Sequence, residues 1–263
     1  MRKPHTSLTR TVLLAALCAC AAVAAPSHGA ATPDARASQG ASAKPTQESR
    51  APDASEAGDA SKAEESCARG EALSKRGDTR GALEALGESA RLYARVYLDA
   101  PTPVPPPAAD APARFRAEMA ARLRRAPQCL ELYARLGGRE GANDFERSQL
   151  EALRAHAVGI TESDASRVVY FGPETDTRAV ITYRPQPRFP REARRDNLFK
   201  TVRLRVVLGA DGEARDPLVL SGSESAFLES SAEAAKGTQF KPAVKGGRAV
   251  SQFVTLEYNF STH

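Results

Sequence analysis

Apolar residues follow three different patterns along the chain. Residues 31–60 show no apolar period, whereas between residues 61 and 158 apolar side chains recur every three or four positions, which predicts amphipathic helices. From residue 167 onward the period falls to two, which predicts strands with one buried face. This order indicates an α+β fold, with a helical domain at 61–158 followed by a smaller α+β domain at 167–263.

The helical domain is expected to contain two helices before a proline-rich break and two or three helices after it. A Gly-containing turn separates the first two helices, and Asp78 or Thr79 is placed to cap the second. Asn143 and Glu146 have the spacing of a capping box for the last helix. Residues 71–94 resemble a single tetratricopeptide unit, so two alternatives stand, a plain helical bundle or a peptide-binding groove.

The C-terminal domain shows an order of strand, hairpin, strand, helix and strand. Two short strands are expected on either side of a turn at residues 173–176. Alternation over residues 202–208 predicts the next strand, and the pair Asp211–Gly212 predicts a tight hairpin. An amphipathic helix at 223–236 and a long last strand at 249–260 complete a three-stranded antiparallel sheet with one packed helix. The last strand places these residues on one face: Val250, Gln252, Val254, Leu256, Tyr258 and Phe260.

Several short motifs in this domain occur in a specific order. The segment QPRFP, which contains Phe189, matches a QPxYP motif with Phe in place of Tyr, and Phe240 begins an aromatic-x-Pro-Ala motif. With the hairpin between them, these motifs make residues 184–260 resemble the C-terminal domain of the TonB energy-transducer family. Two positions depart from that family: Lys200 replaces a Gly, and Thr238 stands where Trp is common.

The resemblance implies a protein-binding function. In that family the domain binds the periplasmic side of outer-membrane transporters, and a short transporter peptide adds to an exposed edge of the last strand. The alternative is that the prolines of QPRFP only shape the start of a short helix that ends at Arg195, and that the last strand is merely the edge of the sheet. The implied partner-binding residues are Gln186, Pro187, Phe189, Pro190, Val250, Gln252, Val254, Leu256 and Tyr258.

The N-terminus has the pattern of an export signal. Basic residues precede an apolar run at 11–25, which is short for a transmembrane helix. Residues 17–20 resemble a lipobox with Cys20 as the lipidated residue; alternatively, a signal peptidase cuts after Ala25 or a few residues later. Residues 26–60 are expected to form a disordered tether, because their composition buries little apolar surface. Both outcomes place the protein in the periplasm, soluble or lipid-anchored.

Two further cysteines, Cys67 and Cys129, lie in the helical domain. An exported protein meets an oxidising compartment, in which two such thiols can pair. They either form a disulfide that closes a loop of about 60 residues or are buried separately as small apolar side chains.

Charge and composition exclude several classes of function. The net charge is +5, but the Arg residues are spread along the chain without interleaved aromatics, so we expect solvated faces and no nucleic-acid partner. The four His residues are scattered, without ligand spacing or a catalytic motif, so we expect no enzyme, no metal and no cofactor. The sequence favours an exported adaptor that binds an envelope protein. The alternative is a divergent membrane-anchored energy transducer of the TonB type.

Overall fold

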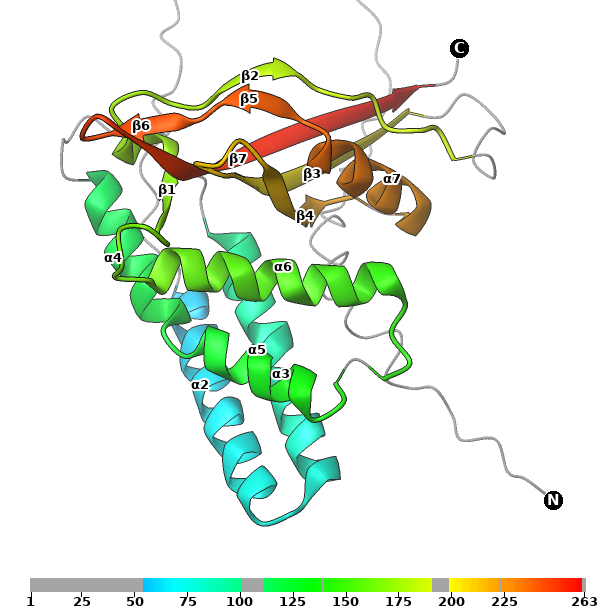
Figure 1. The fold of residues 1–263 in the computed structure, drawn as a ribbon. Helices are drawn as coiled ribbons and strands as arrows, with labels where there is room; N and C mark the ends of the chain where they lie inside the picture. The colour runs from blue at the N-terminus through cyan, green and yellow to red at the C-terminus, as the bar shows by residue number, and fades with distance from the viewer. Residues whose placement is uncertain (1–53, 101–110, 139, 191–198, 223, 262–263) are drawn as a thin grey trace, which may run out of the picture.

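The fold consists of a layer of helices packed against one face of a curled β-sheet, with one further helix on the opposite face (Figure 1). This order, helices first and sheet second, confirms the α+β class. The computed structural model describes residues 54–100, 111–138, 140–190, 199–222 and 224–261.

Five helices of the described chain form the helical layer. The first begins inside the predicted tether, because Ala60 and Ala63 are buried in the helical core and extend the helix toward the N-terminus. The helices are α2 (Ala54–Lys75), α3 (Thr79–Asp99), α4 (Ala111–Leu123), α5 (Ala126–Arg135) and α6 (Asp144–Thr161).

Local capping signals set the starts of two of these helices. The Asp78 carboxylate accepts a hydrogen bond from the Gly81 backbone N–H at 2.9 Å and caps α3. Asn143 and Glu146 form the predicted reciprocal capping box at the start of α6. The hairpin of α2 and α3 is packed against α4 and α5, so the described helices form a bundle, which favours that alternative over a groove.

A disulfide joins Cys67 of α2 to Cys129 of α5. Both side chains are buried in the helical core, and their pairing confirms the first of the two alternatives for these cysteines. The bond closes a loop across a sequence separation of 62 residues, a constraint on the unfolded chain that stabilises the fold by about 4 kcal/mol.

The main sheet is mixed, so the expectation of a three-stranded antiparallel sheet is corrected. Its strand order is β1-β7-β3-β4, and β1 runs parallel to β7 whereas the other pairs are antiparallel. β6 also pairs with β7, and β2 pairs with β5 in a separate two-stranded ribbon. The strands are β1 (Val169–Phe171), β2 (Val180–Tyr183), β3 (Phe199–Leu208), β4 (Ala214–Ser221), β5 (Gln239–Lys241), β6 (Ala243–Lys245) and β7 (Arg248–Ser261).

Over much of the sheet both faces are covered, although Arg203, Glu257 and Asn259 leave one face exposed toward the end of β7. Helix α7 (Ser225–Lys236) packs on the face that carries Leu204 and Leu256. On the other face, Val207, Leu218 and Phe253 join the core of the helical layer. The helical layer and the sheet therefore share one core, and only the edges of the sheet remain for pairing with another chain.

A buried polar chain crosses the contact between the helices and the sheet. His156 of α6 lies between the Tyr97 hydroxyl, 2.6 Å from Nδ1, and the Asp216 backbone carbonyl, 2.8 Å from Nε2. Because a carbonyl only accepts, Nε2 carries the proton and Tyr97 donates to Nδ1. Burial, aided by the nearby charge of Arg205, lowers the pKa of His156 to about 3, so the imidazole is neutral in the folded protein.

Stability is therefore expected to fall in mild acid. In the unfolded chain His156 titrates near its ordinary pKa of about 6.5. Below that pH the unfolded state takes up a proton, whereas the folded state stays neutral until the pH reaches about 3. Acid therefore favours the unfolded state over this range. The contribution of His156 to unfolding free energy should drop by about 2 kcal/mol between pH 7.5 and pH 5. Urea denaturation at pH 7.5 and at pH 5 measures this drop in unfolding free energy. In His156→Gln, whose side chain stays neutral, the drop should be smaller by about 2 kcal/mol. An equal drop in the two proteins contradicts a neutral, buried His156.

Candidate docking edge of the last strand

The partners of β7 change along its length. β3 pairs with residues 252–261 along one edge, and β1 pairs with residues 251–253 along the opposite edge. At the start of β7, residues 248–250 pair with β6. Within the described part of the chain, no strand pairs with Val254–Ser261 on the edge away from β3. We call this stretch the open half of β7.

The prediction of an exposed edge is thus corrected for the first half of the strand. Val250 lies opposite Ala243 of β6, and Gln252 lies opposite Tyr170 of β1. The short strand β1 closes this part of the edge, and its three residues are too few to show an alternation from which that pairing could be predicted.

The predicted side chains of β7 are mostly not available to a partner. Gln252, Leu256 and Tyr258 are buried, and the last two belong to the core under α7. Glu257 and Asn259, which alternate with them, are exposed. A partner can therefore contact the backbone groups of the open half and the side chains of Glu257 and Asn259. It cannot contact the apolar face that the sequence predicted as the binding face.

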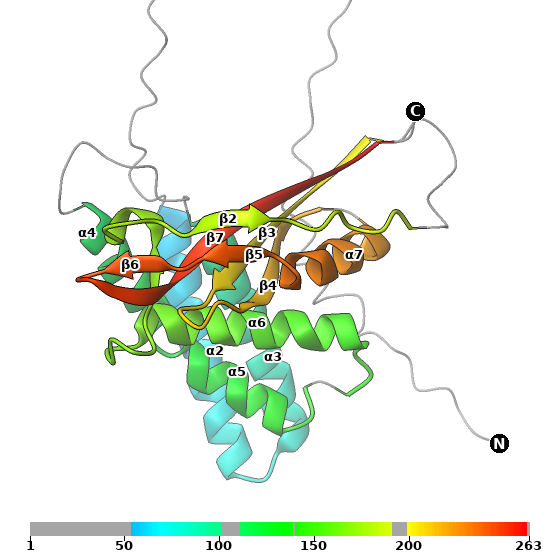
Figure 2. The same ribbon diagram turned by 45° about the horizontal axis from the view of Figure 1, so that its top comes forward.

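Arg184 contacts the open half directly. Its guanidinium donates to the Glu257 backbone carbonyl at 3.1 Å and lies over the Tyr258 ring, 5.2 Å from the centroid. At the other end of β2, the Ala179 N–H donates to the Gln252 side-chain oxygen at 2.8 Å. β2 is thus held beside β7 at both ends while its own pairing is with β5, as Figure 2 shows.

The QPRFP segment is attached to α7. The ring of Phe189 packs edge-on against Phe227 at 5.6 Å and Phe260 at 6.0 Å between centroids. The Ser230 hydroxyl donates to the Arg188 carbonyl at 2.5 Å. Phe189 is therefore a packing residue that brings the segment to the end of β7. The predicted helix through Arg195 falls largely outside the described residues.

Of the other predicted residues in this segment, Gln186 is exposed, whereas Pro187 and Pro190 are half-buried. Gln186 and Pro190 line a groove of about 680 Å³ between the segment and α7. Gln186 is thus the predicted residue of this motif whose side chain is best placed to touch a partner.

Exposed apolar side chains lie on β2 and at the start of β3. Val180 is 53% exposed and Tyr183 is 55% exposed on β2, and Phe199 is 71% exposed. Large apolar side chains that remain in solvent next to an unpaired edge are typical of an interaction surface. Val180 and Tyr183 could not be predicted from the sequence, because alternation within a four-residue strand does not distinguish a buried face from an exposed one.

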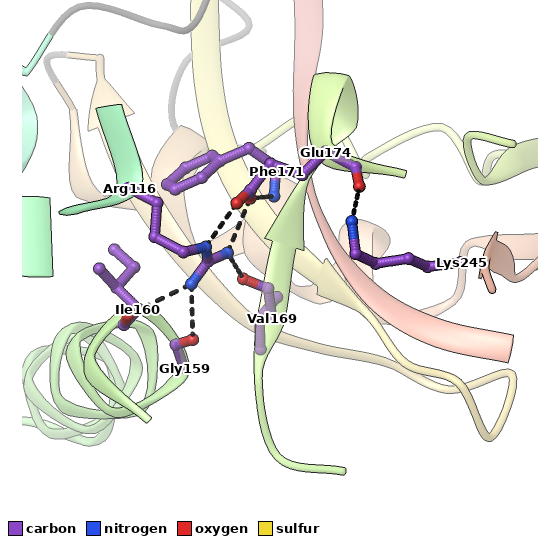
Figure 3. A network of polar contacts seen from close by, with 7 residues as sticks. All are labelled: Arg116, Gly159, Ile160, Val169, Phe171, Glu174 and Lys245. Carbon is purple, nitrogen blue, oxygen red and sulfur yellow. Dashed lines mark hydrogen bonds and ion pairs between the residues drawn. The ribbon is translucent and has the colours of Figure 1, made fainter. Parts of the chain in front are cut away.

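A network centred on Arg116 of α4 holds β1 against β7 (Figure 3). The guanidinium donates to both carboxylate oxygens of Glu174, at 2.6 and 2.8 Å, and to the backbone carbonyls of Gly159, Ile160 and Val169. Glu174 in turn accepts from the Phe171 N–H at 2.7 Å. One charged pair thus joins α4, the end of α6 and β1.

The described residues include a single grouping of candidate metal ligands, Cys67, Glu71 and Cys129. The disulfide between the two cysteines removes the thiolates that would bind a metal, so this grouping is not suited to hold one.

An unpaired sheet edge is the feature that binding by β-strand addition requires. Residues 185–262 match the family model of the Gram-negative bacterial TonB protein C-terminal, which confirms the resemblance. The chain therefore carries a TonB C-terminal domain, which marks it as a TonB-like protein of the cell envelope. The comparison with curated proteins finds no match to the chain. Among the helices of the described residues, none is long and apolar enough to span a membrane.

Arg116→Met should destabilise the protein by about 3 kcal/mol, because it leaves the largely buried Glu174 carboxylate unpaired. Urea denaturation measures the loss, and faster hydrogen exchange at Val169–Phe171 reports the release of β1. The matched control is Arg80→Met, since Arg80 forms its ion pair with Glu84 on an exposed helix face and should contribute under 1 kcal/mol. Equal effects of the two substitutions contradict the role assigned to Arg116.

Proposed function

We propose that this protein is an exported, non-enzymatic adaptor of the cell envelope that docks a periplasmic partner by β-strand addition to the open half of β7. The observation that carries the proposal is the one-sided pairing of Val254–Ser261 among the described strands. An extended peptide laid along this edge gains main-chain hydrogen bonds and displaces the Arg184 guanidinium from the Glu257 carbonyl.

Selectivity in this proposal comes from groups around the edge. Glu257 and Asn259 project from the strand itself, and the apolar side chains of β2 lie close by. Proteins with TonB C-terminal domains interact with envelope proteins such as outer-membrane transporters, so a transporter segment is the partner class we favour.

The location of the adaptor follows from the N-terminal signal. We propose a periplasmic protein that is either soluble or anchored through a lipid on Cys20. Residues 1–25 and most of the tether lie outside the described residues, so this part of the proposal depends on the basic and apolar pattern of the N-terminus.

The alternative function is a divergent TonB-type energy transducer, which is favoured by the same domain match together with the apolar run at 11–25. Coupling to an inner-membrane motor requires that this run remain as an anchor. Mass spectrometry of the mature protein should find a new N-terminus, at an acylated Cys20 or just beyond Ala25. An intact Met1 in membrane-derived protein supports the transducer instead.

A photo-cross-linking amino acid at Glu257 or Asn259 should capture an envelope protein in cells, because both residues are exposed and lie in the open half. The matched control is Ala249, which is exposed on the same strand but lies in the half paired with β6. Peptide mapping of the adduct should identify an extended segment of the partner. Absence of adducts at Glu257 and Asn259, or equal adducts at Ala249, argues against docking at this edge.

A further inference from the structure

A pocket of about 320 Å³ lies where β1 ends and the open half of β7 begins. Phe171 at the end of β1 and Phe253 and Thr255 of β7 line it, together with Arg178. Arg205, from the neighbouring strand β3, also lines this pocket. The pocket therefore opens beside the first residues to which a docked strand would bind.

Arg205 is a buried charge without an acidic partner. Its residue is 4% exposed, and among the described residues no carboxylate lies within ion-pair distance of its guanidinium. An arginine remains protonated at any physiological pH, and buried charges in folded proteins are normally paired. The contact of its guanidinium with the Tyr97 ring, 5.1 Å from the centroid, compensates the charge only partly. Arg116, the other arginine enclosed near β1, has the bidentate partner Glu174.

The other polar groups of the pocket are also suited to an anion. Arg178 brings a second guanidinium, and no acidic side chain is among the described residues that line the pocket. The oxygen of the Gln252 amide accepts from the Ala179 N–H, which leaves its NH₂ group as a donor. Both the Gln252 NH₂ group and the Arg178 Nε lie close to Gly172, since each would be 3.4 Å from a Cβ atom added to this glycine. Arg178, Arg205 and Gln252 thus bring donors to the pocket, and no acidic side chain among its described lining residues balances the two positive charges.

We propose that this pocket binds the carboxylate of an Asp or Glu side chain on the peptide that pairs with the open half of β7. The identity of the carrier rests on the proposed function, whereas carboxylate binding by the pocket does not. Strands in a sheet lie about 4.8 Å apart, so a strand added to β7 lies about 10 Å from β3. The side chain of Arg205 on β3 and an acidic side chain on the added strand together span this distance. One such pair fixes the register of the added strand, since a slip of one residue moves the acid to the other face.

The first test uses acetate as the probe on the full-length mature protein. Acetate at constant ionic strength should shift the Arg205 Nε–Hε NMR signal saturably, and phosphate should bind more weakly. Arg205→Gln should weaken acetate binding roughly tenfold or more, and Arg178→Gln should weaken it less. The matched control is Arg203→Gln, because Arg203 lies two residues earlier on the same strand but is exposed, and this substitution should leave acetate binding unchanged.

Arg205→Gln is expected to fold, because it removes a buried charge that has no acidic partner among the described residues. Should it fail to fold, Arg178→Gln supplies the comparison. No saturable shift, tighter binding of phosphate, or equal effects of the Arg203 and Arg205 substitutions overturns the carboxylate site.

The second test repeats the cross-linking from Glu257 in the Arg205→Gln background. Adducts should fall roughly tenfold and should remain in the Arg203→Gln background. Undiminished adducts overturn this inference while the proposed function stands. Absence of adducts even with Arg205 intact removes the proposed function and the peptide carrier with it, and the acetate titration then decides separately whether the pocket binds carboxylates.

Discussion

The Arg116 guanidinium links helix α4 to the end of α6, to β1 and to the Glu174 carboxylate. The last carbonyls of a helix lack partners within the helix and carry partial negative charge. Arg116 satisfies two of these at the end of α6, through Gly159 and Ile160, and reaches Val169 of β1 and the Glu174 carboxylate as well. Because α6 leads directly into β1, this fixes where the chain turns from the helical layer to the sheet (Figure 3). The parallel pairing of β1 with β7, and thus the point at which the open half begins, depends on it.

The helical layer also explains why docking is confined to an edge. A small sheet with one helix would leave its second face in solvent, but here Val207 and Phe253 on that face are buried among residues of the helices. The consecutive buried residues Val206, Val207 and Leu208 reflect this two-sided burial. A partner cannot pack on the covered parts of the two faces, whereas main-chain pairing along the open half of β7 needs neither of them.

Signals that act within a few residues were predictable from the sequence. The caps at Asp78 and Asn143 and the hairpin at Asp211–Gly212, where Gly212 adopts a φ of +86°, depend on neighbouring atoms. The position of β1 was not predictable, because Val169 pairs with Ser251, far along the chain, and three residues carry no period. The ion pair of Arg116 with Glu174 was likewise not predictable, because the two residues are far apart in the sequence and no local pattern links them. For the candidate site, the sequence predicted partner contact through the apolar face of the last strand, and the structure buries that face under α7.

The sequence contains a sign that Arg205 is buried, but its neighbour Arg203 obscures it. Alternation assigned Arg203, Arg205 and Val207 to one face, and two arginines made that face look solvated; the apolar Val207 was the sign that it is covered. Covering it places a permanent charge next to His156, whose neutral state is favoured by that charge as well as by burial. Replacing a buried, poorly paired charge by an apolar side chain commonly stabilises a protein. A buried charge that has no acidic partner among the described residues and faces a pocket lined by donors is explained by ligand binding rather than by folding, since functional sites are where local costs are retained.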